Sequence, residues 1–313
     1  KLWLQLLHDL DNGGMKKLYR HDHPIAACHI PCTPGINRAF NTIGGIEATR
    51  GCLNHCDFCA ISHSPMGCRL RCKPVSVVVE AITDMPHTYF VFMDSSLNLS
   101  PGYAKRLFKA IAPLDKKFAC FFNADVANDP ELLQLASEAG CIACAIGLET
   151  ISQANINALD KQSNTVADYG RLVERLHDHG IAVMSSLAFG FDNDTRDVFE
   201  TTLEKLKAWG VDSTGANILT PLPGTSLFRQ LKQQNRILTE DWSRYDLYHV
   251  VFQPKHMSPR ELYQGTQRFA SQFYSVSHML SSIFSALQLG YYPFLAILEH
   301  HLTSRLIYQA TFR

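Results

Sequence analysis

The chain has 313 residues, 46% of them hydrophobic, which is enough for one large α/β core and an appendage. Its 29 lysines and arginines balance 29 aspartates and glutamates, so the net charge gives no electrostatic footprint for nucleic acid. Charged residues make up only 19% of the sequence, and this composition excludes intrinsic disorder for the chain as a whole.

Six apolar segments, rich in β-branched or aromatic residues, predict strands. In chain order they are Ile43–Thr49, Thr88–Met93, Phe118–Asn123, Cys141–Leu148, Ile181–Phe189 and Val211–Leu219. A helical pattern separates each strand from the next, so the sequence predicts parallel strands joined by right-handed crossovers.

The helices between these strands have recognisable ends. Ser100–Pro101 and Asp129–Pro130 each combine an N-cap residue with a proline suited to the first helical turn. Asp194 is expected to cap the fifth helix. Glycines, which adopt the left-handed conformation freely, predict the ends of three helices: Gly140, Gly180 and Gly210.

These elements predict an α/β fold, a partial (βα)6 parallel barrel followed by a mainly helical C-terminal appendage. We expect residues 1–40 to form a leader, 41–238 the core and 239–313 the helical region; no local structure is assigned to 239–254. Chemistry in parallel α/β folds takes place at the carboxyl ends of the strands. The polar residues at these predicted ends are Asp94, Asn123, Asp125, Glu149, Ser185, Ser186 and Thr220.

Ten cysteines are many for this length. A disulfide framework is typical of small secreted chains, and this chain is neither small nor led by a signal peptide. Metal or cluster ligation in a reducing compartment is therefore expected. No stretch approaches the ~20 apolar residues of a membrane-spanning helix, so the expected location is cytoplasmic. The first residue is Lys1 rather than methionine, as in a fragment or a processed product.

The run RGCLNHCDFCAIS places Cys52, Cys56 and Cys59 directly after the first predicted strand, in the spacing C-x3-C-x2-C. Three thiolates on a four-iron cluster leave one iron without a protein ligand, where a cofactor or substrate can bind. Zinc is the alternative, because thiolates also bind zinc, but a structural zinc site needs a fourth ligand. That ligand could come from Cys68, Cys72, His55 or His63. The second C-x2-C unit of a zinc knuckle is absent, so the cluster is favoured.

The cysteine run, with Phe58 at its aromatic position, resembles the signature of the radical S-adenosylmethionine (SAM) superfamily. The resemblance extends from about residue 40 to about residue 235. It implies a 4Fe-4S cluster on the three cysteines and SAM chelating the free iron through its amino and carboxylate groups. It also implies reductive cleavage of SAM to a 5′-deoxyadenosyl radical, with an electron donor such as flavodoxin or ferredoxin.

The same resemblance implies SAM contacts at the strand ends. VFMDSSLN is similar to the segment that approaches the methionyl end of SAM, which implies roles for Asp94 and Ser95. AIGLET implies that Glu149 contacts the ribose or amino group, and LAFGF implies that Gly190 lets the backbone approach the adenine. The remaining implied cofactor contacts are Phe58, Ser186 and Pro221.

Each of these roles has a structural alternative. Asp94 and the serines after it suit strand-end turns and helix capping. Glu149 could instead form a salt bridge to a neighbouring strand end, because a buried carboxylate needs a partner. Pro223 and Gly224, in LTPLPGTSLF, are expected to form a structural turn.

The other cysteines and the paired histidines are expected to be structural. Cys120, Cys141 and Cys144 lie in predicted strands and are interpreted as small core residues. His300–His301 is interpreted as a solvated helix face. The cysteines outside the strands, for which a second metal site is the alternative, are Cys28, Cys32, Cys68 and Cys72.

The leader LLHDLDNGGMKKLYR resembles the linker after a cobalamin-binding domain, and VFMDSSLN, IGLET and TPLPGT together resemble the cobalamin-associated branch of the superfamily. The cobalamin domain is not in this chain, so cobalamin would be bound by a domain upstream. Methyl transfer is common in that branch and is the favoured reaction, on a small-molecule or lipid-like substrate. The apolar residues 281–302 are expected to pack on the barrel. A non-catalytic iron–sulfur or zinc binding module is the alternative function.

Overall fold

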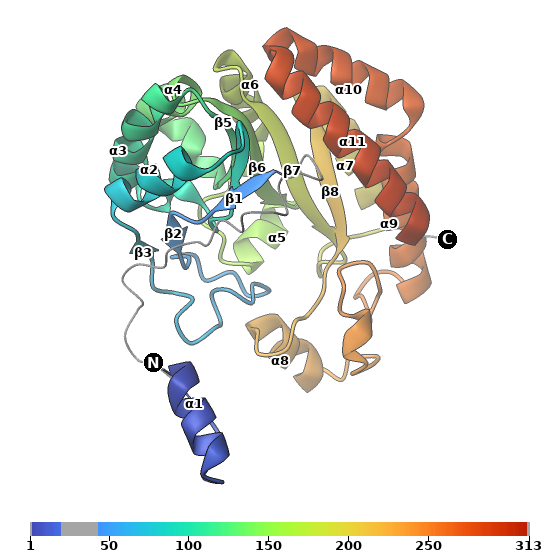
Figure 1. The fold of residues 1–313 in the computed structure, drawn as a ribbon. Coiled ribbons are helices and arrows are strands. Elements are labelled where there is room, and N and C mark those ends of the chain that lie inside the picture. Colours follow the sequence, from blue (N-terminus) through green and yellow to red (C-terminus); the bar gives the residue numbers. More distant parts are fainter. Residues whose placement is uncertain (1, 20–42, 312–313) are drawn as a thin grey trace.

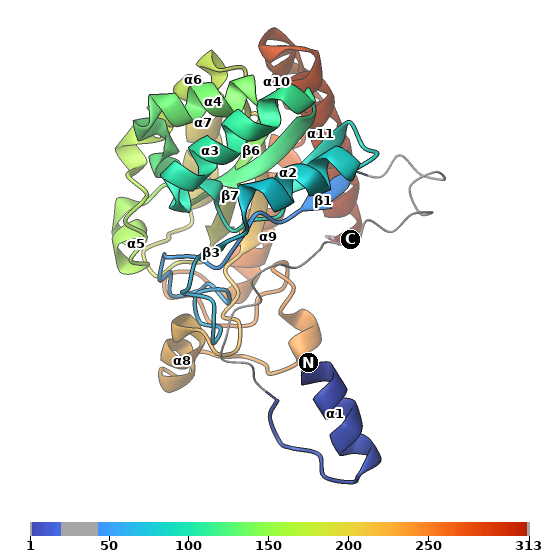
Figure 2. The same cartoon turned by 60° about the vertical axis from the view of Figure 1, so that its left-hand side comes forward.

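The structure, a computed structural model, describes residues 2–19 and 43–311 (Figure 1). Much of the predicted leader therefore lies outside the described residues, and so do Cys28 and Cys32. The first helix, α1 (Leu2–Asp11), buries none of its side chains and stands apart from the sheet in both views (Figures 1 and 2). The domain boundaries at residues 40 and 238 stay predictions.

Six parallel strands form one sheet in the order in which they follow along the chain, which confirms the predicted α/β fold. The strands are β1 (Gly44–Ile46), β4 (Tyr89–Phe92), β5 (Lys117–Phe122), β6 (Cys141–Glu149), β7 (Ala182–Phe189) and β8 (Ser213–Ile218). Because each strand is the neighbour of the next, right-handed crossovers place their helices on one face of the sheet (Figures 1 and 2). Those helices are α2 (Val75–Asp84), α3 (Pro101–Ile111), α4 (Pro130–Glu138), α5 (Gln153–Ala158), α6 (Tyr169–Asp178) and α7 (Val198–Trp209).

The first predicted strand, Ile43–Thr49, is divided in the structure. Its beginning forms β1, whereas its end belongs to β2 (Thr49–Arg50), which leaves the sheet and pairs antiparallel with β3 (Arg71–Cys72). The β2–β3 pair closes the base of the loop that carries the three cysteines. Periodicity alone missed this break because the side chains on both sides of it are buried.

The predicted helix starts at Pro101 and Pro130 are confirmed, and the Asp129 side chain accepts from the Leu132 N–H (3.1 Å). The predicted cap at Asp194 is wrong, because α7 begins at Val198 with Asp197 as its N-cap residue. Asp194 instead folds back on the turn after β7, whose backbone N–H groups it binds. A capping pattern and an Asx turn use the same side chain, so the sequence does not separate them.

The C-terminal region is mainly helical, as predicted, and follows α8 (Ser226–Gln233) through an isolated bridge between Ile237 and Phe252. Its helices are α9 (Pro259–Phe273), α10 (Val276–Leu289) and α11 (Tyr291–Thr311). No helix among the described residues is long and apolar enough to cross a membrane. The hairpin of α10 and α11 packs on the sheet face opposite the crossover helices (Figure 1). There a row of alanines paired in register, Ala119, Ala143 and Ala182, lets the helices approach closely.

Polar side chains from the C-terminal helices cover the free edge of β8. The Tyr274 hydroxyl binds the backbone of Thr214, and the Ala216 N–H donates to the Tyr308 hydroxyl (2.7 Å). His301 is fully buried and its Nε2 donates to the carbonyl oxygen of Asp212 (2.8 Å). An exposed edge strand is an aggregation hazard, so these contacts protect the free edge of the six-stranded sheet.

The interpretation of His300–His301 as a solvated helix face is therefore wrong. His300 Nδ1 lies 2.5 Å from the Ser213 hydroxyl, and burial lowers the pKa of His300 to about 4. Two adjacent histidines suggest a solvent-exposed face, but the start of β8 supplies a buried partner for each: the Ser213 hydroxyl for His300 and the Asp212 carbonyl oxygen for His301.

Replacing Tyr274 by phenylalanine is expected to destabilise the fold by about 1–3 kcal/mol, because the buried N–H and C=O of Thr214 lose their partner. The matched control is Tyr291→Phe, since the Tyr291 side chain is exposed, and it should change the unfolding free energy by less than about 0.5 kcal/mol. Urea unfolding of both variants measures the difference. Equal effects would mean that the Tyr274 hydroxyl does not protect the strand edge.

Candidate functional site

The three cysteines lie on the loop of residues 51–70, between β2 and β3. The loop begins in a left-handed turn at Gly51, where φ is 98° and a Cβ atom would lie 2.3 Å from the Arg69 carbonyl oxygen. Only glycine fits this position without displacing the returning chain. Farther along, the Cys59 N–H donates to the Cys56 carbonyl oxygen (3.0 Å), which forms the turn that carries the second and third thiols.

The three thiols lie within electrostatic reach of one another. Burial raises the pKa of the Cys56 thiol to about 12, the charge of Lys161 lowers it, and Glu149, Cys59 and Cys52 raise it. Burial also raises the pKa of Cys52, to which Cys59 contributes. The fold thus gathers the three predicted ligands and places a lysine and a glutamate beside them.

The donor set fits a cluster held by three thiolates, because iron–sulfur clusters bind cysteine and a bound metal displaces the thiol proton. The proposed fourth donors for zinc are engaged or exposed: the Cys68 thiol donates to the Ser62 carbonyl oxygen (2.7 Å), and Cys72 is exposed on β3. Over residues 2–19 and 43–311, no group of three or more His, Cys, Asp and Glu side chains is arranged to hold a single metal ion.

Helix α8, which follows the last strand of the sheet, packs against the cysteine loop. His63 Nδ1 donates to the Cys59 carbonyl oxygen (2.9 Å), and its Nε2 accepts from the Ser226 hydroxyl (2.8 Å). The Leu227 N–H donates to the Asp57 carbonyl oxygen (3.0 Å). The segment after β8 therefore supports the ligand loop, and this contact joins residues that are far apart in the sequence.

Asp94 is buried at the end of β4 and points into the protein. Its carboxylate accepts from the backbone N–H groups of Ala48 and Thr49 and from the Thr49 hydroxyl (2.6 Å). Burial raises the pKa of Asp94, and these hydrogen bonds lower it. Both carboxylate oxygens hold the connection from β1 to β2, so Asp94 positions the start of the cysteine loop. Its predicted contact with SAM stays a prediction.

Glu149 ends β6 in a left-handed conformation, with φ of 63°, where the pairing with β7 shifts register. Its carboxylate forms a salt bridge with Lys161, and both side chains are nearly buried, with 13% and 6% exposed. Lys161 also donates to the Gly147 carbonyl oxygen (2.7 Å), and a Cβ on Gly147 would lie 2.2 Å from the Glu149 carboxylate. Backbone strain of this kind is stored at functional sites.

Sequence reasoning missed Lys161. The salt bridge expected for Glu149 is present, but its partner follows α5 rather than another strand. A cation a dozen residues after a strand-end glutamate, in the polar run DKQSN, was the available signal.

The other predicted cofactor contacts lie around the same edge of the sheet. Ser186 is partly buried on β7, paired in register with Gly147 on one side and Gly215 on the other. Ser95 follows β4, and Phe58 packs on the main core. Pro221 is buried directly after β8. The contacts of these residues with SAM stay predictions.

Gly190 ends β7 with φ of 107°, and a Cβ there would lie 2.8 Å from Leu262 and 3.1 Å from Phe252. The close approach that requires glycine is therefore made by the chain's own C-terminal part. Asp194 accepts from the Gly190 N–H (2.9 Å) and from the Asn155 side-chain amide (2.8 Å). This network holds the turn after β7.

Stability should depend on pH through Asp194. Burial raises its pKa from 3.8 to about 6, although its hydrogen bonds lower it. The folded state therefore binds the proton more tightly, and the stability linked to this carboxyl is complete below pH 3.8 and is lost as the pH rises through about 6. The expected loss is roughly 2–3 kcal/mol. Urea unfolding across this range should show the decline in the wild type but not in Asp194→Asn, and parallel slopes would contradict the assignment.

The sheet face opposite the crossover helices is partly uncovered near the carboxyl ends of β4 and β5. Met93, just after β4, is 62% exposed, and Phe121 in β5 is 39% exposed, although parallel sheets are normally covered on both faces. A cavity of about 90 Å³ lies beside the cysteine loop, with Asp57, Asn155 and Phe191 among its lining residues. Uncovered apolar side chains and a cavity that Asp57 of the cysteine loop helps to line offer surface to a small molecule.

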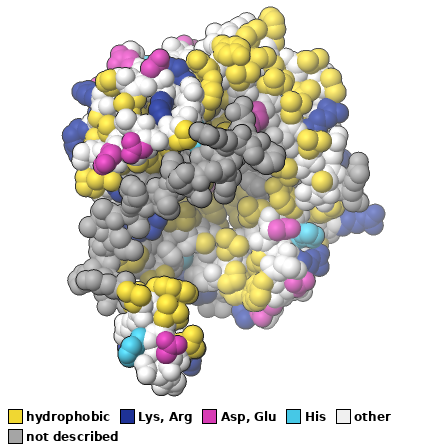
Figure 3. All heavy atoms as spheres, viewed as in Figure 1, with side chains coloured by type: hydrophobic (Ala, Val, Ile, Leu, Met, Phe, Trp, Pro, Cys, Tyr) yellow, Lys and Arg dark blue, Asp and Glu magenta, His cyan; other side chains and the backbone are white. Residues whose placement is uncertain are grey.

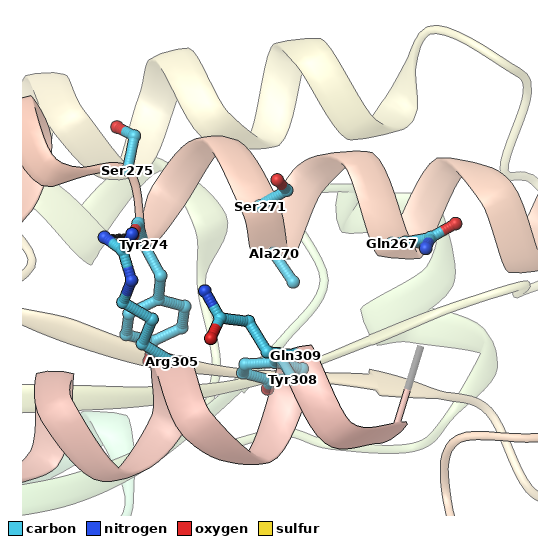
Figure 4. Close-up of a pocket in the computed structure, with 8 residues that line it drawn as sticks. All are labelled: Gln267, Ala270, Ser271, Tyr274, Ser275, Arg305, Tyr308 and Gln309. Carbon is cyan, nitrogen blue, oxygen red and sulfur yellow. Dashed lines mark hydrogen bonds between the residues drawn. The ribbon is translucent and has the colours of Figure 1, made fainter. Parts of the chain in front are cut away.

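A larger hollow of about 220 Å³ lies elsewhere, between α9 and α11 (Figure 4). Arg305 lines it and donates to the Tyr274 carbonyl oxygen (3.3 Å) at the end of α9. None of the predicted site residues lies there, and the Arg305 contact suits the negative end of a helix dipole. Size alone therefore does not identify the site.

Comparison with known proteins identifies the family of the chain. The family model described as the Radical SAM superfamily matches residues 46–206. The bacteriochlorophyllide d C-12(1)-methyltransferase of Chlorobaculum tepidum is 26% identical, over 89% of this chain and 63% of that protein. The hopanoid C-2 methylase of Rhodopseudomonas palustris is 25% identical, over 64% of this chain and 40% of that protein. The chain thus spans less than two thirds of these relatives.

Solved structures share the fold. The methyltransferase TsrM from Kitasatospora setae, with cobalamin and a 4Fe-4S cluster bound, gives a TM-score of 0.61 at 16% identity, covering 85% of this chain and 61% of that one. The cobalamin-dependent enzyme OxsB gives 0.58 at 13% identity, covering 84% and 46%. These likenesses show that the chain shares its fold with both proteins. With the family match over half of its residues, the chain belongs to the radical SAM superfamily.

Proposed function

We propose that the protein binds a 4Fe-4S cluster through Cys52, Cys56 and Cys59 and uses it to cleave SAM reductively. The observation that carries the proposal is the convergence of three thiols at the carboxyl edge of the sheet, beside a strained, salt-bridged glutamate. When bound, the cluster supplies the electron that splits the sulfonium into methionine and a 5′-deoxyadenosyl radical. That electron comes from an external donor such as ferredoxin or flavodoxin.

The chain's own residues orient the reactants. Lys161 fixes the Glu149 carboxylate, which would accept from the ribose or amino group of SAM. Asp94 holds the residues just before the ligand loop and α8 holds its middle, so we expect the fold to set the spacing of the thiols before the cluster binds. The relatives named as methyltransferases support methyl transfer to a small molecule or lipid-like substrate, with cobalamin supplied by a domain outside this chain.

Anaerobic reconstitution with iron and sulfide tests the proposal. We expect about four irons per chain and formation of 5′-deoxyadenosine from SAM and a strong reductant. Glu149→Ala should weaken SAM binding while the iron content stays unchanged. Protein that binds only zinc, with four protein donors, would overturn the cluster. A cluster without 5′-deoxyadenosine above background would leave only the non-catalytic binding module.

A further inference from the structure

The outer face of α10 is an apolar ridge. Val276, Leu280, Phe284 and Leu287 follow one another at helical spacing, and Tyr291 continues the line into α11; each of the five is 49–66% exposed. Figure 3 shows hydrophobic side chains gathered at the top of the molecule, where α10 and the start of α11 lie. We use the name α10 ridge for these five residues.

The ridge is not the packing face of α10. Ser282 and Ala286 are the residues of α10 that are buried, and Ala286 packs on Ala143 and Ala182 of the sheet. The helix therefore carries apolar side chains both toward the protein and on its outer face, where exposed Ser277, Ser281, Ser285 and Gln288 lie between them. The outer apolar side chains are not needed for packing on the sheet, so they mark a contact surface.

Charge distinguishes this helix from the others on the surface. Residues 269–298 contain no Asp, Glu, Lys or Arg, whereas α6 presents Arg171, Glu174 and Asp178 to solvent. In sequence the stretch is bounded by Arg268 and Glu299. In space, two lysines lie beside it, of which Lys117 also pairs with Asp115 at 3.1 Å. Lys207 lies near enough to His278 to lower its pKa, after the larger effect of burial, and Lys117 Nζ lies 5.6 Å from the ring of Tyr292.

An apolar ridge between lysines matches the chemistry of a lipid surface, with acyl chains for the ridge and anionic headgroups for the cations. Exposed apolar surface on the ridge amounts to roughly 500 Å², as much as the largest apolar patch of a typical monomer, and patches of this size often mark interaction sites. We propose that the α10 ridge inserts into the interface of an anionic bilayer. The contact is peripheral, since no described helix can span a membrane, and it leaves the carboxyl edge with the cysteine loop free.

Co-sedimentation of the whole chain with vesicles of phosphatidylcholine and phosphatidylglycerol in equal parts tests the proposal. We expect the wild type to bind and Leu280→Glu/Phe284→Glu to lose at least about tenfold in the partition coefficient, because two inserted side chains become charged. Leu238→Glu is the matched control, since Leu238 is equally exposed but lies outside the ridge, and it should bind as the wild type does.

Two further measurements keep the proposal independent of any folding defect. Phe284→Trp should show a blue shift of its added fluorescence with the same vesicles, and Lys117→Gln should bind more weakly at low salt. Failure of the wild type to bind the vesicles would overturn the proposal. So would a wild-type dimer in light scattering that Leu280→Glu/Phe284→Glu dissociates, because a second copy would then cover the ridge. Cluster content and SAM cleavage are measured apart, so either proposal can fail alone.

Discussion

Replacing Cys56 by alanine is expected to abolish both the brown cluster chromophore and the formation of 5′-deoxyadenosine. Cys56 is the buried member of the three thiols and is flanked by the other two, so its loss leaves a cluster with only two protein ligands. Iron content, the visible spectrum and product formation after anaerobic reconstitution measure the effect. Product should fall to the level seen without a cluster.

Cys72→Ala is the control for the loss of a cysteine as such. Cys72 is exposed on β3, near the ligand loop but outside the three-cysteine run, so its loss should leave iron content and product formation unchanged. If Cys56→Ala kept the iron content of the wild type, the three cysteines would not be the ligands. If Cys72→Ala lost the iron as well, Cys72 would be a fourth protein ligand, and the cluster would have no open iron for SAM.

Replacing Lys161 by methionine is expected to destabilise the metal-free protein by about 3–5 kcal/mol. The change leaves the Glu149 carboxylate charged and without its partner in a nearly buried position, and it removes the donor to the Gly147 carbonyl oxygen. Urea unfolding gives the loss directly. The double change Lys161→Met/Glu149→Gln should recover part of it, because no unpaired charge is then buried.

A surface salt bridge supplies the comparison. Lys232 pairs with Glu240 at 2.7 Å, but both side chains are more than half exposed, so Lys232→Met should cost no more than about 1 kcal/mol. Similar losses at Lys161 and Lys232 would show that burial adds nothing to the Glu149 pair. Urea unfolding of the metal-free protein measures the structural role of Lys161. Its proposed role in orienting Glu149 is measured separately, as SAM binding by the cluster-loaded protein.

Hydrophobic periodicity and capping residues predicted much of the fold. Six apolar segments became six strands, and the pairs Ser100–Pro101 and Asp129–Pro130 became helix starts, because periodicity and capping depend on residues within one or two turns. The same local reasoning failed where one pattern serves two structures. Asp194 resembles an N-cap but closes an Asx turn, and Ile43–Thr49 resembles one strand but bends out of the sheet at its end.

The sequence by itself determined the chemistry of the proposed ligands, because the spacing of Cys52, Cys56 and Cys59 confines three thiols to one short loop after the first strand. Only the tertiary structure decided which buried polar groups face one another: Glu149 with Lys161, Asp94 with Thr49, and His301 with the free edge of β8. The physical reason is that a buried charge or hydrogen-bonding group needs a partner, and that partner can come from any segment the fold brings near.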